Sequence, residues 1–290
     1  MPQEKTIEVG IINVVLHPHS PDLYVKLFRE ARNNKISGII NKNKRARVGF
    51  IENYKDFSGE MLYGRLFFYT VLNPNEPWLD DESGEIASDD QLEQLREQLR
   101  SLYPEFRAMR FALDPSAHKL YFEVKNEERK SFSPSTVHKA LISIFNNPKI
   151  QEDFGEVELT IVPTQDALEK ILKIEDLRKF SIDLRPPNSD GWSDESEELE
   201  KWLEEMNVSR LEQNLTKSKG AQTITPDERT LKLARVAQQN GKVVGSGYTN
   251  GKKVTESTES YPKVEKYKLD NKTSAVEAFK GFITRTFRIK

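Results

Sequence analysis

Near the start of the chain, hydrophobic residues recur with the period of β-strands, apart from one helical stretch. Runs of β-branched and aromatic residues predict four strands, at 7–16, 36–40, 47–54 and 61–72. After the first of them, Pro21-Asp22 opens a predicted helix whose apolar face carries Leu23, Leu27 and Ala31. The chain is therefore expected to begin β-α-β-β-β.

Two segments with different patterns follow these strands. Residues 73–90 are rich in Pro, Asp and Glu and predict an exposed loop. Residues 88–102 predict an amphipathic helix, with Ser88 as its N-cap and Gln91 at the capping-box position. The apolar stripe of this helix consists of four leucines, Leu92, Leu95, Leu99 and Leu102.

The middle of the chain alternates strands and helices with short connections. Strands are predicted at 106–113, 119–124, 157–162 and 180–184, and helices at 133–145 and 164–173. Asp114-Pro115-Ser116 predicts the turn between the first two of these strands. This order indicates an α+β fold of mainly antiparallel sheets, with helices packed on one face.

The run Arg185-Pro186-Pro187-Asn188 ends this pattern and predicts a domain boundary. We expect a globular α+β domain at 1–187 and a smaller, basic α+β domain at 188–290. An acidic segment, with Trp192 and Trp202 as apolar anchors, leads into the second domain. Its further elements are a helix at 226–239, a hairpin around Asn250-Gly251 and a strand at 261–269. A last helix is predicted at 273–290. It belongs to the second domain or, as the alternative, completes the first domain.

Composition narrows the class of protein. Of 290 residues, 36% are hydrophobic and 31% are charged, which is enough for a packed core beneath a charged surface. There is no cysteine, which excludes disulfides, thiolate metal sites and a cysteine nucleophile. No apolar run approaches the roughly 20 residues that span a bilayer, and the first residues lack the apolar segment of a signal peptide. We expect a soluble, cytoplasmic protein without direct membrane insertion.

The net charge of −2 conceals an uneven distribution. Residues 210–290 contain 17 Lys and Arg against 8 Asp and Glu, and residues 26–47 contain eight against one. Residues 190–205 show the opposite excess, with eight acids against one lysine. Basic regions of this kind favour an anionic partner. The alternative is that the C-terminal basic region pairs with the acidic segment, within one chain or across a dimer.

One arrangement resembles an active site. Asp114 on one strand, followed by Glu123 and Lys125 on the next, is similar to the layout of the PD-(D/E)xK metal-dependent nucleases. Against this interpretation, Asp-Pro is a common turn pair, and Glu-x-Lys on a strand is an ordinary exposed ion-pair row. A nuclease is therefore the second hypothesis. His17 and His19 lack accompanying ligands, so neither a metal site nor another cofactor is predicted.

The leading hypothesis from charge is phosphate contact with double-stranded DNA, because positioned lysines and arginines give affinity without sequence choice. A basic two-stranded ribbon is one known way of touching DNA. The candidate contacts are thirteen of the Lys and Arg residues in the two basic regions: Lys42, Lys44, Arg45, Arg47, Lys217, Lys219, Lys232, Arg235, Lys242, Lys252, Lys253, Arg285 and Arg288.

A resemblance supports this hypothesis. The segments 137–145 (VHKALISIF), 157–163 (VELTIVP) and 181–185 (SIDLR) are similar in order and spacing to the phage lambda RexA-like exclusion protein family. Earlier segments resemble bacterial and prophage proteins of about this length, at 64–68 (GRLFF), Pro77-Trp78 and 118–123 (HKLYFE). Together these motifs cover most of the chain, and each is mainly apolar.

The resemblance implies a homodimer that binds DNA without sequence preference and acts in phage exclusion or antiviral defence. It also implies that the smaller second domain is mobile and that the fold is related to RdgC. It also implies a membrane effector of RexB type as a partner. It matches no DNA-contact residue one for one, so the candidate contacts rest on charge alone. A third hypothesis is a protein-interaction adaptor of a defence system, using the acidic segment or the loop at 73–90. Neither the DNA-binding hypothesis nor the adaptor hypothesis involves catalysis, so an enzyme is expected only under the nuclease hypothesis.

Overall fold

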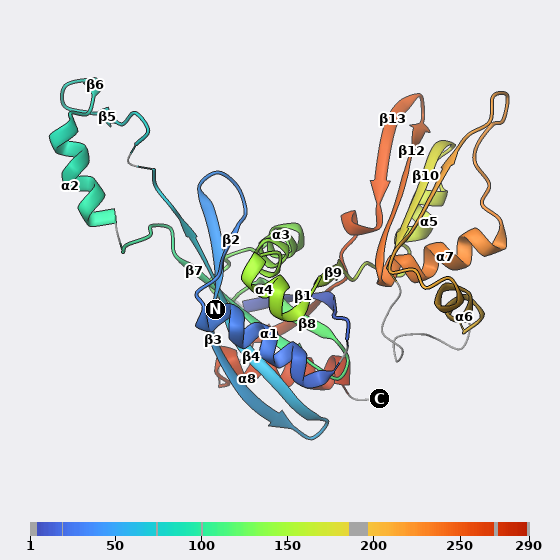
Figure 1. Cartoon of the computed structure of the whole chain (residues 1–290), viewed down its shortest axis with the longest axis horizontal. Helices are drawn as coiled ribbons and strands as arrows, with labels where there is room; N and C mark the ends of the chain where they lie inside the picture. The colour runs from blue at the N-terminus through green and yellow to red at the C-terminus, as the bar shows by residue number, and fades with distance from the viewer. Residues whose placement is uncertain are drawn as a thin grey trace.

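The computed structural model describes residues 5–18, 20–73, 75–99, 101–185, 197–269 and 272–288. Its named strands pair antiparallel, and the fold is α+β, as the sequence predicts (Figure 1). A main sheet and a second sheet each have their own core, and a small two-stranded hairpin stands apart from both. Three features named above lie outside the described residues: His19, Trp192 and the stop at 186–188.

The main sheet has eight strands. Along its path the order is β14-β1-β8-β7-β4-β3-β2, and β9 also pairs with β1. The strands are β1 (Lys5–Val15), β2 (Ser37–Ile39), β3 (Lys44–Asp56), β4 (Gly59–Thr70), β7 (Arg107–Asp114), β8 (Lys119–Lys125), β9 (Glu158–Ile161) and β14 (Val264–Leu269). The predicted β-α-β-β-β opening is confirmed, and a strand from the far end of the sequence lies beside β1.

Three helices cover one face of the main sheet: α1 (Pro21–Asn33), α3 (Pro134–Phe145) and α4 (Pro148–Phe154). Each begins with a side-chain N-cap followed by proline, the caps being Ser20, Ser133 and Asn147. Phe28 packs its ring against those of Phe111 and Phe145, so α1 and α3 meet over the sheet. The sequence pattern does not predict α4, because seven residues are too few for a clear helical period.

The C-terminal helix packs on the opposite face of the same sheet. α8 (Ala275–Ile283) continues into a π-helical turn, Thr284–Arg288, and contributes Phe279, Phe282 and Ile283 to a core with residues of β1, β4 and β8. The rings of Tyr267 and Phe282 stack with centroids 4.4 Å apart, which ties β14 to this helix. The helix α8 therefore packs on the main sheet, on the face opposite α1, α3 and α4.

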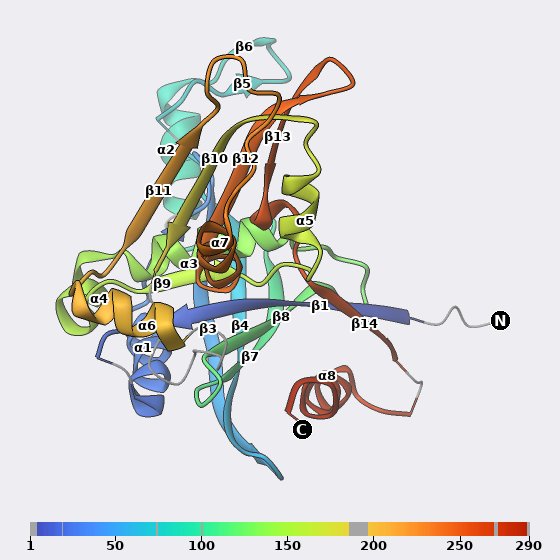
Figure 2. The same cartoon turned by 90° about the vertical axis from the view of Figure 1, so that its right-hand side faces the viewer.

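The second sheet has four strands in the order β11-β10-β12-β13. They are β10 (Asp176–Leu184), β11 (Leu211–Thr216), β12 (Gly241–Thr249) and β13 (Lys252–Ser257). The helices α5 (Ala167–Leu172), α6 (Glu197–Glu205) and α7 (Glu228–Gln239) pack on one face, and Figure 2 shows α7 on the near side of the sheet. Because β10 is a central strand here, the chain changes sheets before α5, earlier than the predicted boundary at 187.

Two antiparallel segments join the first body, which is the main sheet with its helices, to the second body, which is the second sheet with its helices. Pro163 and Pro262 form an isolated bridge, and the Thr164 N–H donates to the Tyr261 carbonyl at 2.8 Å. A buried side-chain contact adds to this junction, because Asn13 Nδ2 donates to Asn240 Oδ1 at 2.7 Å. The chain thus leaves the main sheet and returns to it along neighbouring paths.

Residues 71–106 form an arm between β4 and β7 that projects from the main sheet (Figure 1). It carries the hairpin of β5 (Leu79–Asp80) and β6 (Glu85–Ile86) and the helix α2 (Asp89–Leu99). The predicted capping box is confirmed: the Ser88 N–H donates to Gln91 Oε1 at 2.8 Å, and the Gln91 N–H donates to Ser88 Oγ at 3.4 Å. The short hairpin lies in the segment that the sequence predicts as a loop.

Candidate nucleic-acid interface

The residues of the nuclease hypothesis do not meet. Asp114 lies at the end of β7, where its Oδ1 accepts the N–H groups of Ser116 and Ala117, both at 3.1 Å. Its other oxygen pairs with Arg288 Nε at 2.7 Å. The carboxylate is therefore fully occupied by a turn and an arginine.

Glu123 is held by a different arginine. Its oxygens accept the Arg110 N–H at 3.0 Å and Arg110 Nη1 at 2.5 Å, and Arg110 also pairs with Glu127. Burial raises the pKa of Glu123, and the Arg110 charge and hydrogen bonds act in the opposite direction. This is the environment of a structural ion pair.

The strand register keeps the two carboxylates apart. Asp114 lies opposite Lys119, so Glu123 follows four residues further along β8, or about 13 Å at the usual rise of a strand. Lys125 lies at the end of β8, bridged to Ser131. Within the described part of the chain, no group of three or more acidic or histidine side chains could hold a metal ion.

The basic candidates of the second domain are partly brought together. Lys217, Lys219, Lys252 and Lys253 lie at the end of the second sheet remote from the main sheet, in the loop after β11 and beside the β12–β13 turn. Two further residues from the start of β10 join them. We call this set the distal basic cluster: Arg178, Lys179, Lys217, Lys219, Lys252 and Lys253.

Arg178 and Lys179 were missed by the sequence analysis, which begins this strand at residue 180. β10 begins at Asp176 and has a register irregularity between Leu177 and Lys179, so two adjacent basic residues are both exposed there. In the sequence, the two adjacent basic residues directly before the buried Phe180 were the signal that could have identified them.

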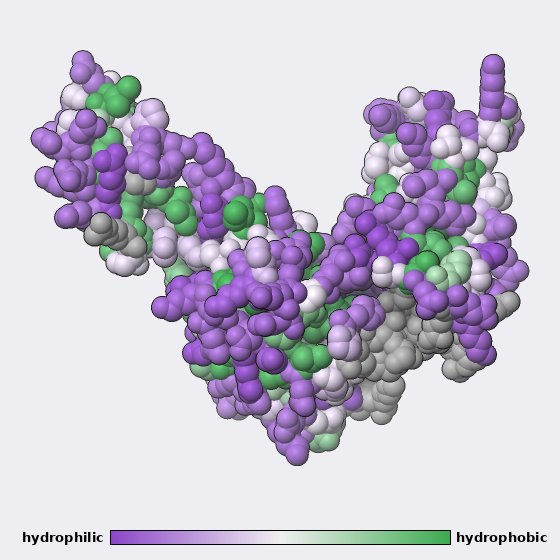
Figure 3. All heavy atoms as spheres, viewed as in Figure 1, coloured by the Kyte–Doolittle hydropathy of each residue, from purple (hydrophilic) through white to green (hydrophobic). Residues whose placement is uncertain are grey.

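A polar sheet face continues from this cluster. Leu177, Phe180 and Ile182 point into the core beneath the helices, so alternation turns the other residues of β10 outward. Next to the cluster the outward side chains are hydroxyls and lysines: Lys179, Ser181, Ser246, Tyr248, Lys253 and Thr255. Nearer the main sheet the same alternation turns Asp183 and Glu212 outward, where both pair with Arg210. No helix of the described residues packs on this face, which we call the uncovered face; it lies toward the arm across the open recess in Figure 3.

Aromatic and ionic contacts order part of this surface. The Arg178 guanidinium lies 4.2 Å from the centre of the Tyr248 ring, a cation–π contact across the face. Asp176 pairs with both Lys217 and Arg178. Their hydrogen bonds hold the pKa of Asp176 below its usual range. One carboxylate thus anchors two cations and leaves a net positive charge.

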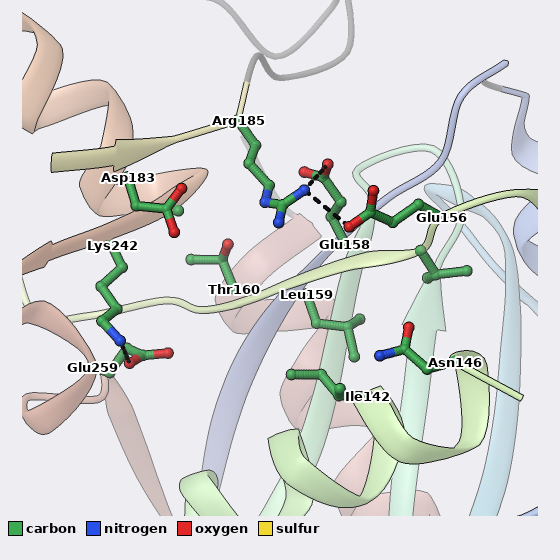
Figure 4. Close-up of a pocket in the computed structure, with 12 residues that line it drawn as sticks. Ile142, Asn146, Glu156, Glu158, Leu159, Thr160, Asp183, Arg185, Lys242 and Glu259 are labelled. Carbon is green, nitrogen blue, oxygen red and sulfur yellow. Dashed lines mark hydrogen bonds and ion pairs between the residues drawn. The ribbon is translucent and has the colours of Figure 1, made fainter. Parts of the chain in front are cut away.

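The opposite end of the second sheet is different. A pocket of about 270 Å³ lies where this end meets β9 and α3 (Figure 4). Arg185 pairs there with Glu158 at 2.7 Å and Glu156 at 3.1 Å. Burial raises the pKa of Glu158, and Arg185 opposes that shift. Lys242, a predicted DNA contact, pairs with Glu259 at 3.4 Å in this pocket and lies apart from the distal basic cluster.

The remaining candidates are dispersed. Lys232 and Arg235 lie on the exposed side of α7, which packs on the other face of the second sheet. Arg285 is exposed on the first body. The structure argues against Arg288 as a DNA contact, because its side chain is 5% exposed and pairs with Asp56 and Asp114.

In the first basic region, at 26–47, some of the basic side chains bind the backbone of the β2–β3 turn or residues of the arm. Arg45 Nη1 donates to the carbonyl oxygens of Asn41 and Lys42 at 2.6 and 3.0 Å, which closes the β2–β3 connection. Lys42 pairs with Glu76 of the arm at 2.6 Å. Lys44 is exposed, and Arg47 lies over the Tyr69 ring. This region lies on the main sheet, away from the distal basic cluster.

Comparison with known proteins gives a family without a described activity. Residues 5–284 match the family model DUF4747, described as a domain of unknown function. A search of curated proteins found no match. Across the described residues, no helix has the length and apolar character needed to cross a membrane.

Proposed function

The chain belongs to the DUF4747 family, and from its structure we propose that it binds the phosphate backbone of double-stranded DNA through the distal basic cluster and the uncovered face. The observation that carries the proposal is the balance of charge at the distal end. Six basic side chains gather there with the carboxylates of Glu175 and Asp176, and Asp176 is already shared by two of them.

Four lysines of the cluster are available to a ligand. Within the described residues, no ion pair involves these four, which are Lys179, Lys219, Lys252 and Lys253. A lysine ammonium is a mobile point charge suited to phosphate oxygens. Hydroxyls of Ser181, Ser246 and Thr255 on the same face can add hydrogen bonds to the backbone. This donor set supports affinity for a polyanion.

The same donor set supports binding without sequence preference. Reading a base edge usually takes a bidentate side chain such as arginine, asparagine or glutamine. The one arginine of the cluster, Arg178, is engaged with Asp176 and Tyr248. Phosphate contacts position a duplex but carry no sequence information directly.

The biological setting is a separate part of the proposal. Phage exclusion and a membrane effector of RexB type follow from the resemblance to RexA-like proteins and from nothing in the geometry, and self-association is first implied by the same resemblance. They extend the DNA-binding proposal and can fail without affecting it.

The test is fluorescence anisotropy of labelled random-sequence duplexes at two salt concentrations. Four lysine–phosphate contacts correspond to a slope of about −3.6 in log affinity against log salt, or roughly a hundredfold loss between about 50 and 200 mM. Binding that is equally tight at both concentrations would refute the phosphate-contact proposal.

The chain offers a matched control for the surface. Lys252→Glu/Lys253→Glu should weaken binding to every duplex alike, whereas Lys232→Glu/Arg235→Glu changes the net charge equally on the opposite side of the same domain and should have little effect. Equal losses in both variants would mean a response to net charge, and a loss confined to the α7 variant would place the site there.

The same samples with Mg²⁺ test the nuclease alternative on a denaturing gel. Intact DNA is expected, because Asp114 and Glu123 are each occupied by an arginine. Cleavage that disappears in Glu123→Gln, in a variant that still folds, would restore the nuclease hypothesis.

A further inference from the structure

The described residues of the arm at 71–106 form a hairpin and a helix but no core of their own. None of its described residues is buried, although its base is fixed by hydrogen bonds such as Thr70 N–H to the Pro104 carbonyl at 3.0 Å. A two-stranded hairpin and a helix of eleven residues are each marginal in isolation. An element of this kind gains stability when another surface covers its apolar side chains.

The arm displays a large share of the exposed hydrophobic surface. Leu79 and Ile86 are cross-strand partners in the hairpin and are each 72% exposed. Leu102, Tyr103 and Phe106 are exposed where the arm returns to β7. Figure 3 shows hydrophobic residues at the surface of the arm on the face in view. Exposed apolar residues gathered on one element favour an interaction site.

The spacing on α2 indicates another helix as the partner. Leu92, Leu95 and Leu99 are separated by three and four residues, and Leu102 repeats the interval of three beyond the helix end. This is the a/d pattern of a coiled-coil seam, which is narrower than the stripe of a helix that packs on a globular core. The three leucines within the helix are only half-buried.

Charge identifies the class of occupant. Residues 71–106 contain ten Asp and Glu against two arginines, so a nucleic acid or an anionic lipid surface would be repelled. Most acids of α2 avoid the seam: Asp90, Glu93 and Glu97 fall at positions remote from it, while Asp89, Gln91 and Arg96 flank it. Between Leu92 and Leu99, two copies of the stripe can therefore approach without acidic side chains facing each other.

We propose that α2 pairs with α2 of a second copy of this chain through the leucine seam, making the arm a dimerisation element. A two-fold axis presents the same stripe from both copies, so the surface is self-complementary. The hairpin residues Leu79 and Ile86 extend the contact beyond the seam. The inference rests on the self-association named in the proposed function, and it is independent of DNA binding.

Sedimentation of the full chain over a range of concentrations tests the surface. The wild type should approach twice the chain mass, and Leu95→Glu/Leu99→Glu should sediment as a monomer at concentrations where the wild type is dimeric. The control Glu93→Gln/Glu97→Gln changes the opposite side of the same helix at the same spacing and should remain dimeric. A monomeric wild type, or a seam variant as dimeric as the wild type, would overturn the inference.

The absence of cysteine permits a second, independent measurement. Under mild oxidation, Leu95→Cys/Leu99→Cys should give a cross-linked dimer whether the helices run parallel or antiparallel, whereas Glu93→Cys/Glu97→Cys should not. Equal yields from both pairs, or none from the seam pair, would contradict the pairing even if the glutamate variant failed to fold.

DNA titrations separate this result from the proposed function. The monomeric seam variant should keep its affinity for a duplex too short to contact two copies, because the distal basic cluster lies on a different body. A dimer that pairs elsewhere would overturn only the choice of surface. A monomeric wild type would also remove the self-association part of the proposed function. A wild type that dimerises through α2 but does not bind DNA would overturn DNA binding and leave the dimerisation inference standing.

Discussion

Arg288 and Asp114 form an ion pair with 2.7 Å between Nε and Oδ2, and each side chain is 5% exposed. Sequence patterns assign the two residues to separate functions, one to DNA contact and the other to metal binding. In the folded chain they neutralise each other, with Asp56 as a second partner of the arginine at 2.8 Å. The pair fastens the C-terminal turn to the end of β7, so both residues serve the fold.

Replacement of this arginine should therefore cost stability. Arg288→Met leaves the carboxylates of Asp56 and Asp114 buried without their cation, which is expected to destabilise the protein by about 3–5 kcal/mol. Urea unfolding measures the effect, and Arg285→Met, at an exposed position of the same turn, should change stability by less than about 0.5 kcal/mol. Equal stability of the two variants would show that the pair contributes little.

Lys119 gives a prediction in pH. Its Nζ donates to Asn13 Oδ1 at 3.2 Å, and burial lowers its pKa from 10.5 to about 8. Above pH 8 the folded chain releases this proton while the unfolded chain keeps it, so stability should rise with pH by about 1.4 kcal/mol per unit from this group.

The measurement compares unfolding free energies of wild type and Lys119→Met between pH 8 and pH 10. Above about pH 10 the tyrosines interfere, because burial raises the pKa of Tyr54, Tyr121 and Tyr267 and their ionisation favours the unfolded chain. The upward slope should vanish in the methionine variant. Parallel pH profiles of the two proteins would place the Lys119 pKa near its ordinary value.

Gly38 permits the close approach of β2 to α3. A Cβ at this position would lie 2.6 Å from the Ala140 carbonyl oxygen and 2.7 Å from the Ile144 side chain. Gly38→Ala should therefore destabilise the protein by about 1–3 kcal/mol through overpacking. Thermal unfolding tests this against Ile39→Ala, at a neighbouring residue that is 55% exposed; a smaller loss for the glycine variant would contradict the packing argument.

A substitution of Lys179 tests whether this residue belongs to the proposed DNA interface. If its ammonium contacts one phosphate, Lys179→Ala should weaken all duplexes alike and lower the magnitude of the salt slope by about 1. Ser181→Ala, two residues along the same face, removes no charge and should leave the slope unchanged. An unaltered slope in the lysine variant would exclude Lys179 from the contact.

Sequence patterns that span only a few residues were sufficient to predict most of the helices, strands and turns. The N-cap and proline at Ser133-Pro134, the capping box of Ser88 and Gln91 and the turn at Asn250-Gly251 each depend on neighbours in sequence, and each is found in the structure. The strands missed or shortened were those with weak local signals. β11 (LEQNLT) is polar on alternate positions and only half-buried, so its pairing with β10 defines it more than its composition does.

The sequence by itself determined the α+β class, the order of most elements and the excess of basic residues near the end of the chain. Tertiary structure decided which of those charges remain available. Arg288 pairs with Asp56 and Asp114, and Lys242 with Glu259, whereas Lys179 and Lys253 lie on the same uncovered face although they are distant in sequence. The physical reason is that helix caps and turns are local interactions, whereas ion pairing and exposure depend on strand order, which hydrophobic burial sets across the whole chain.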